Sequence, residues 1–487
     1  MDTSSPLMPL LRVILPKVPL MGKTALSHTL GLSEHSKHWD LRTTLTVTTL
    51  RSFLTDSPPQ PLSKIQRMSL KAPEIKGRIW VSKVVLKRPE EEDVWSKLQE
   101  AIDMLRGEGE ETGEKGGVRA PGVVDVEAEW TGYRAGATRS SVELKISEED
   151  KYKEMMKEVE SPVTVLYFHG GAYYLMDPAT HRPTTKKLAK LTKGRCLSIR
   201  YRLAPQHPFP AALLDALIAY LTLLYPPPGS LHAAVAPEHI VLAGDSAGGN
   251  LALALLQLLL HFQRHTPPTL LLFNNQHVAL PLPAGVATCS PWTDITHSSP
   301  SCKRNLSTDY LPPLTSRPHP ADEIWPASPP RNNLYAADAV LTHPLVSPLS
   351  APSWHGSCPL YIATGTELLT DEDRHVAAKA ARQGARVVYD EFEAMPHCFA
   401  MMLEGLPVSR MFFERWAGFM RACVEGAGAD GAMELKTKGT RIRAKTLVQE
   451  SVAVEGLSDE GDESVLQRMT KRVREMSGEV PDTVAKL

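Results

Sequence analysis

A serine stands between two glycines at residues 244–248, within the stretch LAGDSAGGN. A serine hydroxyl attacks a carbonyl carbon only when a base takes its proton, and a Gly-x-Ser-x-Gly turn between a strand and a helix exposes the hydroxyl for that attack. The strand-like HIVLA precedes Ser246 and the helix-forming NLALALLQLLL follows it. We therefore predict that Ser246 is a nucleophile on a tight strand-to-helix turn.

The base and the acid that such a serine needs are expected later in the chain, in the order serine, acid, histidine. His397 lies in MPHCF, just after the strand-like ARVVYDEFE, and is the predicted base. Glu367 follows within two residues of the strand-like PLYIATG and is the predicted acid. Asp371 is the alternative acid, although the carboxylates at 371–373 suit the first turn of a helix, where they complement the helix dipole.

Two stretches are predicted to hold the negative charge that develops on the substrate oxygen. HGGAYY, at 169–174, offers the N–H groups of Gly170 and Gly171 without side chains in the way. The N–H of Ala247 lies at the start of the predicted helix, where negative charge is favoured. His169 is expected to brace the loop rather than to react.

The elements that must position these residues form a repeating pattern from about residue 160. Apolar strand-like runs alternate with segments long enough for crossover helices: VTVLYFHGG, RCLSIRYR, HIVLAGDS, AGVATCSPW, PLYIATG and ARVVYDEFE. Continuous apolar strands separated by helices indicate a parallel sheet covered on both faces. We predict one doubly wound α/β domain over residues 116–425.

The flanking regions differ from this pattern. Residues 1–115 are mixed and helical in character, end in the charged, glycine-rich RGEGEETGEKGG, and are expected to form a cap or arm. Residues 426–487 are rich in charged and small amino acids, a composition that predicts a mobile tail with a short helix at 464–476. Within the domain, 264–283 and 296–335 are rich in Pro, Ser and Asn and are expected to be lids or binding loops.

Composition excludes several classes of protein. The formal net charge is −1, without the basic excess typical of a nucleic-acid binder. The six cysteines show neither CxxC pairs nor a metal-ligand spacing, which favours free thiols in a reducing compartment and no metal site. We expect a cytoplasmic protein that is not secreted, because the N-terminus fits neither a signal peptide nor a membrane span. It could instead rest on a membrane surface such as the endoplasmic reticulum, with Arg12, Lys17 and Lys23 near the headgroups, or cover the substrate.

Seven ordered blocks resemble a known family, the hormone-sensitive-lipase-like α/β-hydrolases, and within it the fungal steryl-acetate hydrolases and arylacetamide-deacetylase-type esterases. The blocks are HGGAYYLMDPATHR, YRLAPQHPFPAALLDA, GDSAGGNLA, SPWTD, HPLVSPL, GTELLTDE and MPHCFAMM. The resemblance implies the α/β-hydrolase fold, with a mostly parallel eight-stranded sheet and a helical cap from the N-terminal region. It also implies that Ser246 is the nucleophile, His397 the base, and Gly170, Gly171 and Ala247 the oxyanion donors.

This chain departs from the family pattern at two positions. The family usually has Asp where Glu367 stands, in a block reading D-P-L-R-D-E against ELLTDE here. Glutamate also serves as the acid of such triads, but its longer arm keeps Asp371 open as the alternative. Ala172 replaces the last glycine of the family's HGGG run, which should leave the preceding N–H groups usable.

The expected function is that of a serine carboxylesterase working through an acyl-enzyme on Ser246, without metal or organic cofactor. The family likeness points to hydrophobic esters with a short acyl group, such as acetyl esters of a sterol, lipid or secondary metabolite. One alternative is acyl transfer to an alcohol by the same residues. Another is a non-catalytic small-molecule receptor on the same fold, since the family includes a plant hormone receptor that lacks the complete triad.

Overall fold

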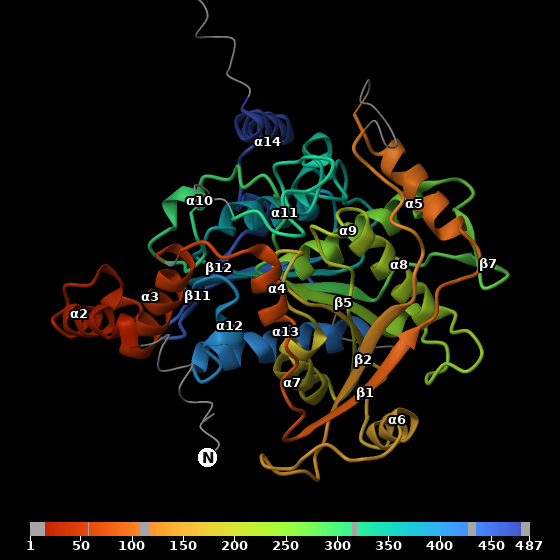
Figure 1. Ribbon diagram of the computed structural model, residues 1–487, viewed down its shortest axis with the longest axis horizontal. Coiled ribbons are helices and arrows are strands. Elements are labelled where there is room, and N and C mark those ends of the chain that lie inside the picture. The colour runs from red at the N-terminus through yellow and green to blue at the C-terminus, as the bar shows by residue number, and fades with distance from the viewer. Residues whose placement is uncertain (1–14, 57, 108–115, 314–318, 427–434, 479–487) are drawn as a thin grey trace, which may run out of the picture.

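The computed structural model describes residues 15–56, 58–107, 116–313, 319–426 and 435–478. Its centre is a ten-stranded sheet in the order β1-β2-β4-β3-β5-β8-β9-β10-β11-β12 (Figure 1). The strands are β1 (Ile79–Leu86), β2 (Val126–Tyr133), β3 (Thr164–Phe168), β4 (Arg195–Ile199), β5 (Ile240–Asp245), β8 (Gly285–Cys289), β9 (Leu360–Gly365), β10 (Val387–Glu393), β11 (Lys438–Arg443) and β12 (Gln449–Val452).

All neighbours from β4 to β11 pair in parallel, whereas β1, β2 and β12 join by antiparallel pairing. The predicted α/β domain with a mostly parallel sheet is confirmed, but the sheet has ten strands rather than the expected eight. Because parallel strands end at the same edge, the loops that follow β3, β5, β8, β9 and β10 gather there. These loops carry the residues for which sequence analysis predicts chemistry.

Helices cover both faces of the sheet. Alternate residues of each strand point to opposite faces, and because both sets are apolar, both faces are buried. In β3, Leu166 and Phe168 belong to one buried cluster, and Val165 and Tyr167 to the other. The first cluster packs against α5 (Asp93–Met104), α8 (Ala211–Leu224), α9 (Ala247–Arg264) and α11 (Thr370–Arg382). The second packs against α7 (Arg182–Thr192), α12 (Phe399–Met402) and α13 (Pro407–Glu425).

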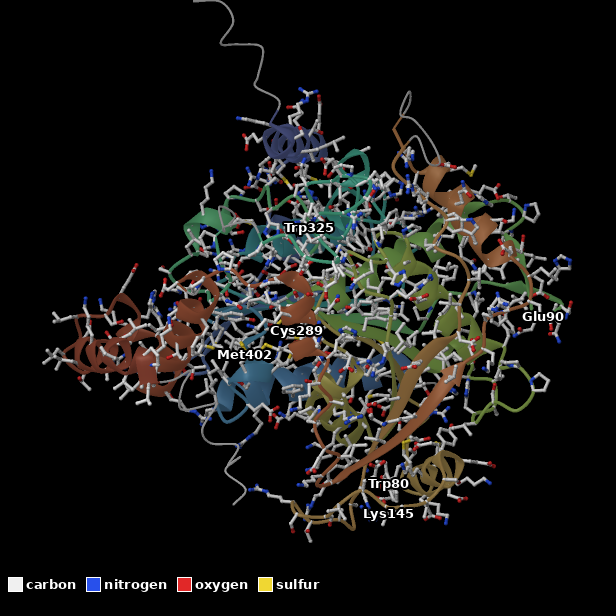
Figure 2. The ribbon with its side chains drawn as sticks, viewed as in Figure 1. Trp80, Glu90, Lys145, Cys289, Trp325 and Met402 are labelled. Atoms are coloured by element: carbon white, nitrogen blue, oxygen red, sulfur yellow. The ribbon has the colours of Figure 1, made fainter. Side chains whose placement is uncertain are left out.

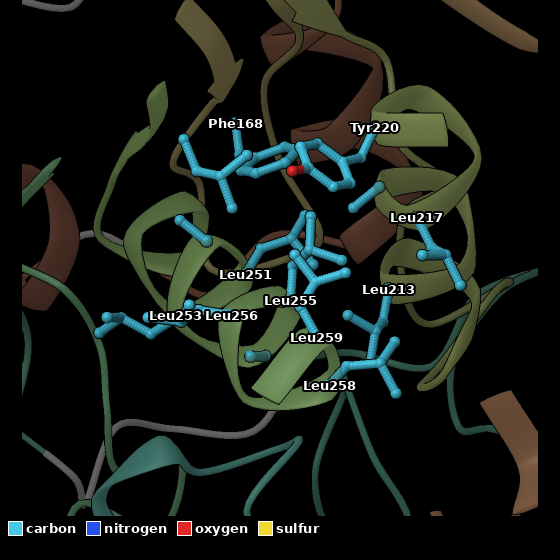
Figure 3. Close-up of a cluster of buried hydrophobic side chains, with 14 of the residues drawn as sticks. Phe168, Leu213, Leu217, Tyr220, Leu251, Leu253, Leu255, Leu256, Leu258 and Leu259 are labelled. Atoms are coloured by element: carbon cyan, nitrogen blue, oxygen red, sulfur yellow. The ribbon is translucent and has the colours of Figure 1, made fainter. Parts of the chain in front are cut away.

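The contact between α8 and α9 is the most thoroughly buried part of the first cluster. Every residue of α8 is buried, and so is nearly all of α9. Figure 3 shows leucines of the two helices packed together beside Phe168 of β3. This packing holds the start of α9, and with it Ser246, against the end of the neighbouring strand.

The N-terminal helices α2 (Val18–Thr29), α3 (Leu41–Thr55) and α4 (Leu62–Ser69) lie beside the sheet's carboxyl edge (Figure 1). Trp39 Nε1 donates to the carbonyl of Ala394, just after β10, and Gln66 Nε2 donates to that of Tyr174, after β3. A covering position was expected for this region. However, the boundary predicted at residue 115 is wrong, because β1 belongs to the sheet.

The mobile tail expected after residue 425 is wrong for residues 438–477. β11 pairs with β10, and its Arg441 and Arg443 form ion pairs with Glu391 and Glu393 of that strand. Helix α14 (Asp462–Ser477) occupies the place of the predicted short helix, and Arg468 Nη1 donates to Ser298 Oγ at 2.8 Å. Several of the charges that suggested a tail therefore have partners on β10 or, as for Asp462 with Lys379 at 2.8 Å, on α11.

The two stretches expected to be lids differ in structure. Residues 264–283 include a hairpin of β6 (Leu270–Phe273) and β7 (Gln276–Ala279), and the backbone N–H of Leu272 donates to Asp93 of α5. This hairpin is therefore bound to α5 rather than forming a lid. The stretch 296–335, of which 314–318 lie outside the described residues, includes the short helix α10 (Ser301–Arg304) and reaches the candidate site.

Three expectations concern residues outside the described part of the chain. These are the exposed loop over 108–115, the first fourteen residues with Arg12, and the end of the tail beyond residue 478. In the described ranges, no helix is long and apolar enough to cross a bilayer. Helix α6 (Glu148–Met156) packs beside β1.

Candidate active site

Ser246 lies on the predicted turn, between β5 and the first residue of α9. Its φ of 53° and ψ of −120° are unusual for a residue with a side chain, and such strain concentrates at functional sites. A Cβ on Gly244 would lie 2.3 Å from the carbonyl oxygen of Gly248, and a Cβ on Gly248 would lie 2.0 Å from that of Phe168. The close approach of strand, turn and helix therefore requires both glycines of the motif.

His397 and Glu367 form a buried pair at the same edge of the sheet. The Nδ1 atom of His397 lies 2.5 Å from Oε2 of Glu367. The other oxygen, Oε1, accepts from Ser290 Oγ, from Thr364 Oγ1 at 3.2 Å and from the N–H of Gly365 at 3.2 Å. The carboxylate is thus fixed from both sides and directs the His397 ring.

The two charges of this pair shift each other's pKa. Burial alone would raise the pKa of the Glu367 carboxyl, but the charge and hydrogen bond of His397 hold it below its usual value. Burial alone would lower the pKa of His397, but Glu367 holds it above its ordinary 6.5. Glu367 therefore stabilises a protonated imidazole in a site that would otherwise exclude the charge.

Asp371, the alternative acid, has other partners. Its Oδ2 accepts from the N–H of Ser301 at 2.9 Å, and its Oδ1 pairs with Arg304 at 2.6 Å. It lies in the first turn of α11, as the sequence pattern suggested. The structure thus brings His397 to Glu367 and not to Asp371.

Ser246 and the His397 loop meet at the end of β8. The N–H of Ser246 donates to the carbonyl of Cys289, and the N–H of Cys398 donates to Ser290 Oγ at 3.2 Å. Cys289 lies near the centre of the molecule in Figure 2. Among the described residues, no hydrogen bond joins Ser246 Oγ to the His397 ring, a contact that often tightens only when substrate is bound.

Asp309 is a further residue of the site that the sequence did not single out. Its Oδ1 accepts the backbone N–H of His397 at 3.2 Å, and its Oδ2 accepts that of Leu368 at 3.0 Å. Burial and then the charge of Glu367 raise the pKa of Asp309. The stretch 296–335 had been identified as a binding loop, but nothing in its sequence distinguishes Asp309 from the neighbouring polar residues.

Asp309 is in turn connected to the N-terminal helices. The guanidinium group of Arg51, in α3, donates through Nε to the carbonyl of Asp309 at 2.8 Å and through Nη2 to that of Ser307 at 2.8 Å. Burial lowers the pKa of Arg51, although Asp309 opposes the shift. The covering helices are therefore tied to the loop that holds the predicted base.

The three expected oxyanion donors differ in whether their N–H groups already have a hydrogen-bond partner. The N–H of Gly170 donates to Asp245 Oδ1 at 3.2 Å, which corrects the expectation that this group is free for the substrate. In the part of the chain that the structure describes, the N–H of Gly171 has no hydrogen-bond partner. The N–H of Ala247 belongs to the first turn of α9, whose N–H groups lack partners within the helix.

His169 has the bracing role that was expected. Its ring stacks on Tyr201 with centroids 4.2 Å apart, and its Nδ1 lies 2.7 Å from the carbonyl oxygen of Gly170. Burial lowers the pKa of His169 to about 3, so the ring is neutral at ordinary pH. It fixes the loop after β3 without carrying a charge into the site.

The cysteines and the acidic residues show no metal centre. All six cysteines are free and buried. Over the ranges described above, no group of three or more His, Cys, Asp or Glu side chains could hold a metal ion.

Comparison with known proteins identifies the family. Residues 165–401 match a family model described as the alpha/beta hydrolase fold. An acetyl-hydrolase from Streptomyces hygroscopicus is 31% identical over 259 residues, which cover 53% of this chain and 75% of that protein. The chain belongs to the α/β-hydrolase family. An esterase from Acinetobacter venetianus is 27% identical to this α/β-hydrolase over 264 residues, covering 53% and 74% of the two chains.

Solved structures agree with this assignment of the fold. A crystal structure of an esterase from the bacterial hormone-sensitive lipase family gives a TM-score of 0.51 at 20% identity, over 79% of this α/β-hydrolase and 99% of that chain. An esterase/lipase from an uncultured bacterium gives 0.50 at 25% identity, over 78% and 99%. The predicted α/β-hydrolase family is confirmed, and the predicted enzyme class, carboxylic ester hydrolase, agrees with the names of these relatives.

Proposed function

We propose that this α/β-hydrolase is a serine carboxylesterase that works through an acyl-enzyme on Ser246. The observation that carries the proposal is the buried pair of His397 and Glu367 at the sheet edge where Ser246 occupies its strained turn. A histidine held by a carboxylate near a partly exposed serine, such as Ser246, is the arrangement that nucleophilic acyl transfer requires.

In the proposed reaction, His397 takes the proton of Ser246 as its oxygen bonds to the ester carbonyl carbon. The N–H groups of Gly171 and Ala247 stabilise the resulting oxyanion, while Gly170 stays bound to Asp245. His397 then gives its proton to the leaving alkoxide, and the alcohol departs. A water molecule, deprotonated by His397, attacks the acyl group and returns Ser246 to its free form with release of the acid.

We propose a hydrophobic ester with a short acyl group, such as an acetyl ester of a sterol, lipid or secondary metabolite, as the substrate. A relative named an acetyl-hydrolase supports the acyl part. Trp39, just before α3, and Gln66 of α4 bind the loops after β10 and β3, and we take this cover over the site as support for an apolar alcohol part. In a covered site water is scarce around the ester, which strengthens the electrostatic contacts with the oxyanion.

The test uses p-nitrophenyl esters of increasing chain length with the wild type, Ser246→Ala and the control Ser140→Ala, at an exposed loop position. We expect the control to match the wild type and Ser246→Ala to lose nearly all activity, with acetate and butyrate esters preferred. Mass spectrometry of enzyme quenched during turnover should find the acyl group on the peptide with Ser246. Equal rates for wild type and Ser246→Ala would overturn the esterase proposal, and a preference for long chains would overturn the short-acyl one.

We also propose that α2 contacts a membrane surface. α2 has no buried residue and lies at one end of the molecule (Figure 1). Leu26 and Leu30 are each 62% exposed, and the nearby Lys23 is exposed as well. Lys17, expected near the headgroups, instead donates to the carbonyl of Ser52 in α3. Exposed leucines beside a lysine favour the interface of an anionic bilayer.

A further inference from the structure

A strongly basic cavity opens beside α7, apart from the candidate active site. Its volume is about 690 Å³, and it lies between α7, the start of α13 and the segments that flank β1 and β2. Seven of its thirteen lining residues are Lys or Arg and two are Glu. The lining thus carries an excess of five positive charges on a chain whose formal net charge is −1. Neither Ser246 nor His397 lines it.

The basic residues reach this cavity from four separate parts of the chain. Lys76 and Arg78 precede β1, Arg139 follows β2, Lys186 lies in α7 and Arg410 in α13. Like charges that line one cavity repel one another, although salt screens the repulsion between exposed groups. The fold therefore holds together a set of charges that an anion in the cavity would stabilise.

Most of these cations lack an acidic partner. Of the described residues, none forms an ion pair with Lys186, Arg139 or Arg410. Lys187 does pair with Glu404, at 3.5 Å, and Lys76 pairs with Glu74, which does not line the cavity. Burial, and to a smaller degree Lys186, lower the pKa of Lys187, although Glu404 opposes the shift. The cavity thus has unneutralised positive charge, on the half-buried Lys186 and on the exposed Arg139 and Arg410.

Aromatic rings hold two of the ammonium groups without neutralising them. Lys187 Nζ lies 4.1 Å from the centroid of the Phe413 ring, and Lys190 Nζ lies 4.9 Å from that of Tyr133. Arg78 Nη1 donates to the hydroxyl of Tyr133 at 3.1 Å. Contacts of this kind fix the direction of a cation but leave N–H groups free for a ligand. The wall is therefore positioned in advance for an anion.

We propose that this cavity is a binding site for a phosphate-bearing anion, either the headgroup of a phospholipid or a free polyphosphate. Phosphate oxygens accept charge-assisted hydrogen bonds from lysine and arginine, and the planar guanidinium groups of arginine bind two oxygens at once. The cavity volume accommodates a ligand of many atoms, within the range usual for small-molecule sites. The site is independent of the proposed esterase reaction.

The experiment compares the full-length protein with the triple variant Lys186→Gln, Lys190→Gln, Arg410→Gln. The matched control removes the same charge elsewhere: Lys145→Gln, Lys303→Gln, Lys445→Gln, three exposed residues outside the cavity. Calorimetry measures binding of inorganic pyrophosphate, and co-sedimentation measures binding to phosphatidylcholine vesicles with and without phosphatidic acid. Circular dichroism and the thermal midpoint report whether each variant is folded.

We expect pyrophosphate to bind the wild type and the control alike and the cavity variant at least about tenfold more weakly, since three charge-assisted hydrogen bonds are lost. If phosphatidic acid vesicles bind in the same pattern and pyrophosphate competes, the ligand is a lipid headgroup. If only pyrophosphate binds, it is a free anion. Absence of both kinds of binding, or an equal loss in the control, would overturn the proposal, whatever the outcome of the esterase assay.

Discussion

The backbone N–H of His397 donates to Oδ1 of Asp309 at 3.2 Å. The other oxygen of the same carboxylate accepts the N–H of Leu368, the residue after Glu367. One buried side chain thus joins the loop of the proposed base to the turn of the proposed acid. Because Arg51 binds the Asp309 carbonyl, the covering helices share in this arrangement.

Replacing Asp309 should lower kcat more than it raises KM. In Asp309→Asn, one of the two N–H groups faces an amide NH₂ instead of an oxygen, and the loop of His397 loses its anchor. A buried donor without a partner costs about 1–3 kcal/mol, which predicts a loss of roughly tenfold to a hundredfold in kcat. Steady-state kinetics on p-nitrophenyl acetate checks this, with the exposed Asp459→Asn as control.

The pH profile distinguishes this positioning role from simple damage to the fold. The charges of Glu367, Asp309 and Asp245 all raise the pKa of His397. His397 must be neutral to act as a base, so a lower pKa moves the acid limb of kcat/KM to lower pH. Asp309→Asn should show that shift together with a thermal midpoint that falls by only several degrees, as the loss of one buried hydrogen bond predicts. A reduced rate with an unmoved limb would argue against the role.

Glu367→Gln should remove most of the activity, whereas Asp371→Asn should leave it nearly unchanged. A neutral amide neither holds the proper tautomer of His397 nor stabilises its charged form, and the equivalent change in serine proteases costs about 10⁴ in kcat. Asp371 instead pairs with Arg304 and Arg374 and accepts the N–H of Ser301. If Asp371→Asn proves the damaging change, the assignment of the acid is wrong.

The titration of His397 gives a second test of its pairing with Glu367. Burial alone lowers the pKa of His397, and the carboxylate of Glu367 is the main group that raises it above 6.5. The wild-type ring should therefore titrate above this value by NMR, and the Glu367→Gln ring well below it. Titration of the two rings at the same pH would contradict the pairing.

The sequence was most informative where chemistry follows directly on a regular element. Ser246, Glu367 and His397 each come after an apolar strand, and parallel strands bring their ends to one edge, so the pattern alone could place them. Asp309 lies in an irregular stretch, and its partner His397 is 88 residues away. No local periodicity predicts such a contact.

Strand β11, near the end of the sheet, was not predicted from the sequence, and the physical reason is different. Strand β11 contains Arg441 and Arg443 besides Lys438, and these charges suggest a solvated segment when the sequence is read alone. The arginines' partners Glu391 and Glu393 lie on β10, about fifty residues earlier, and neutralise them across the sheet. Among the described residues of the tail, only a few positions such as Ile442 and Met469 are apolar and buried. Strand β11 therefore forms because it pairs with the distant strand β10, which composition alone does not predict.

Gly171→Ala should reduce kcat strongly while the fold survives. Gly171 has a φ of 109°, and a Cβ there would lie 2.3 Å from the carbonyl oxygen of Leu175, so the loop must move its N–H. Loss of one oxyanion donor typically costs about 2.7–4 kcal/mol, or a hundredfold to a thousandfold in kcat. Gly136→Ala is the control, since a Cβ there meets nothing within 4 Å. A nearly unchanged kcat would exclude Gly171 as a donor.

Charged substitutions on α2 test the proposed membrane contact. Leu26→Glu with Leu30→Glu places two carboxylates on a face that now exposes leucine, which removes apolar burial and adds repulsion from an anionic bilayer. Binding to anionic vesicles should fall at least about tenfold, whereas hydrolysis of the soluble p-nitrophenyl acetate should not change. Leu466→Glu, on the exposed side of α14, is the matched control. If the double variant binds vesicles as the wild type does, α2 is not the membrane contact. A smaller hydrodynamic size of the double variant than of the wild type would then show that these leucines join two copies of the chain.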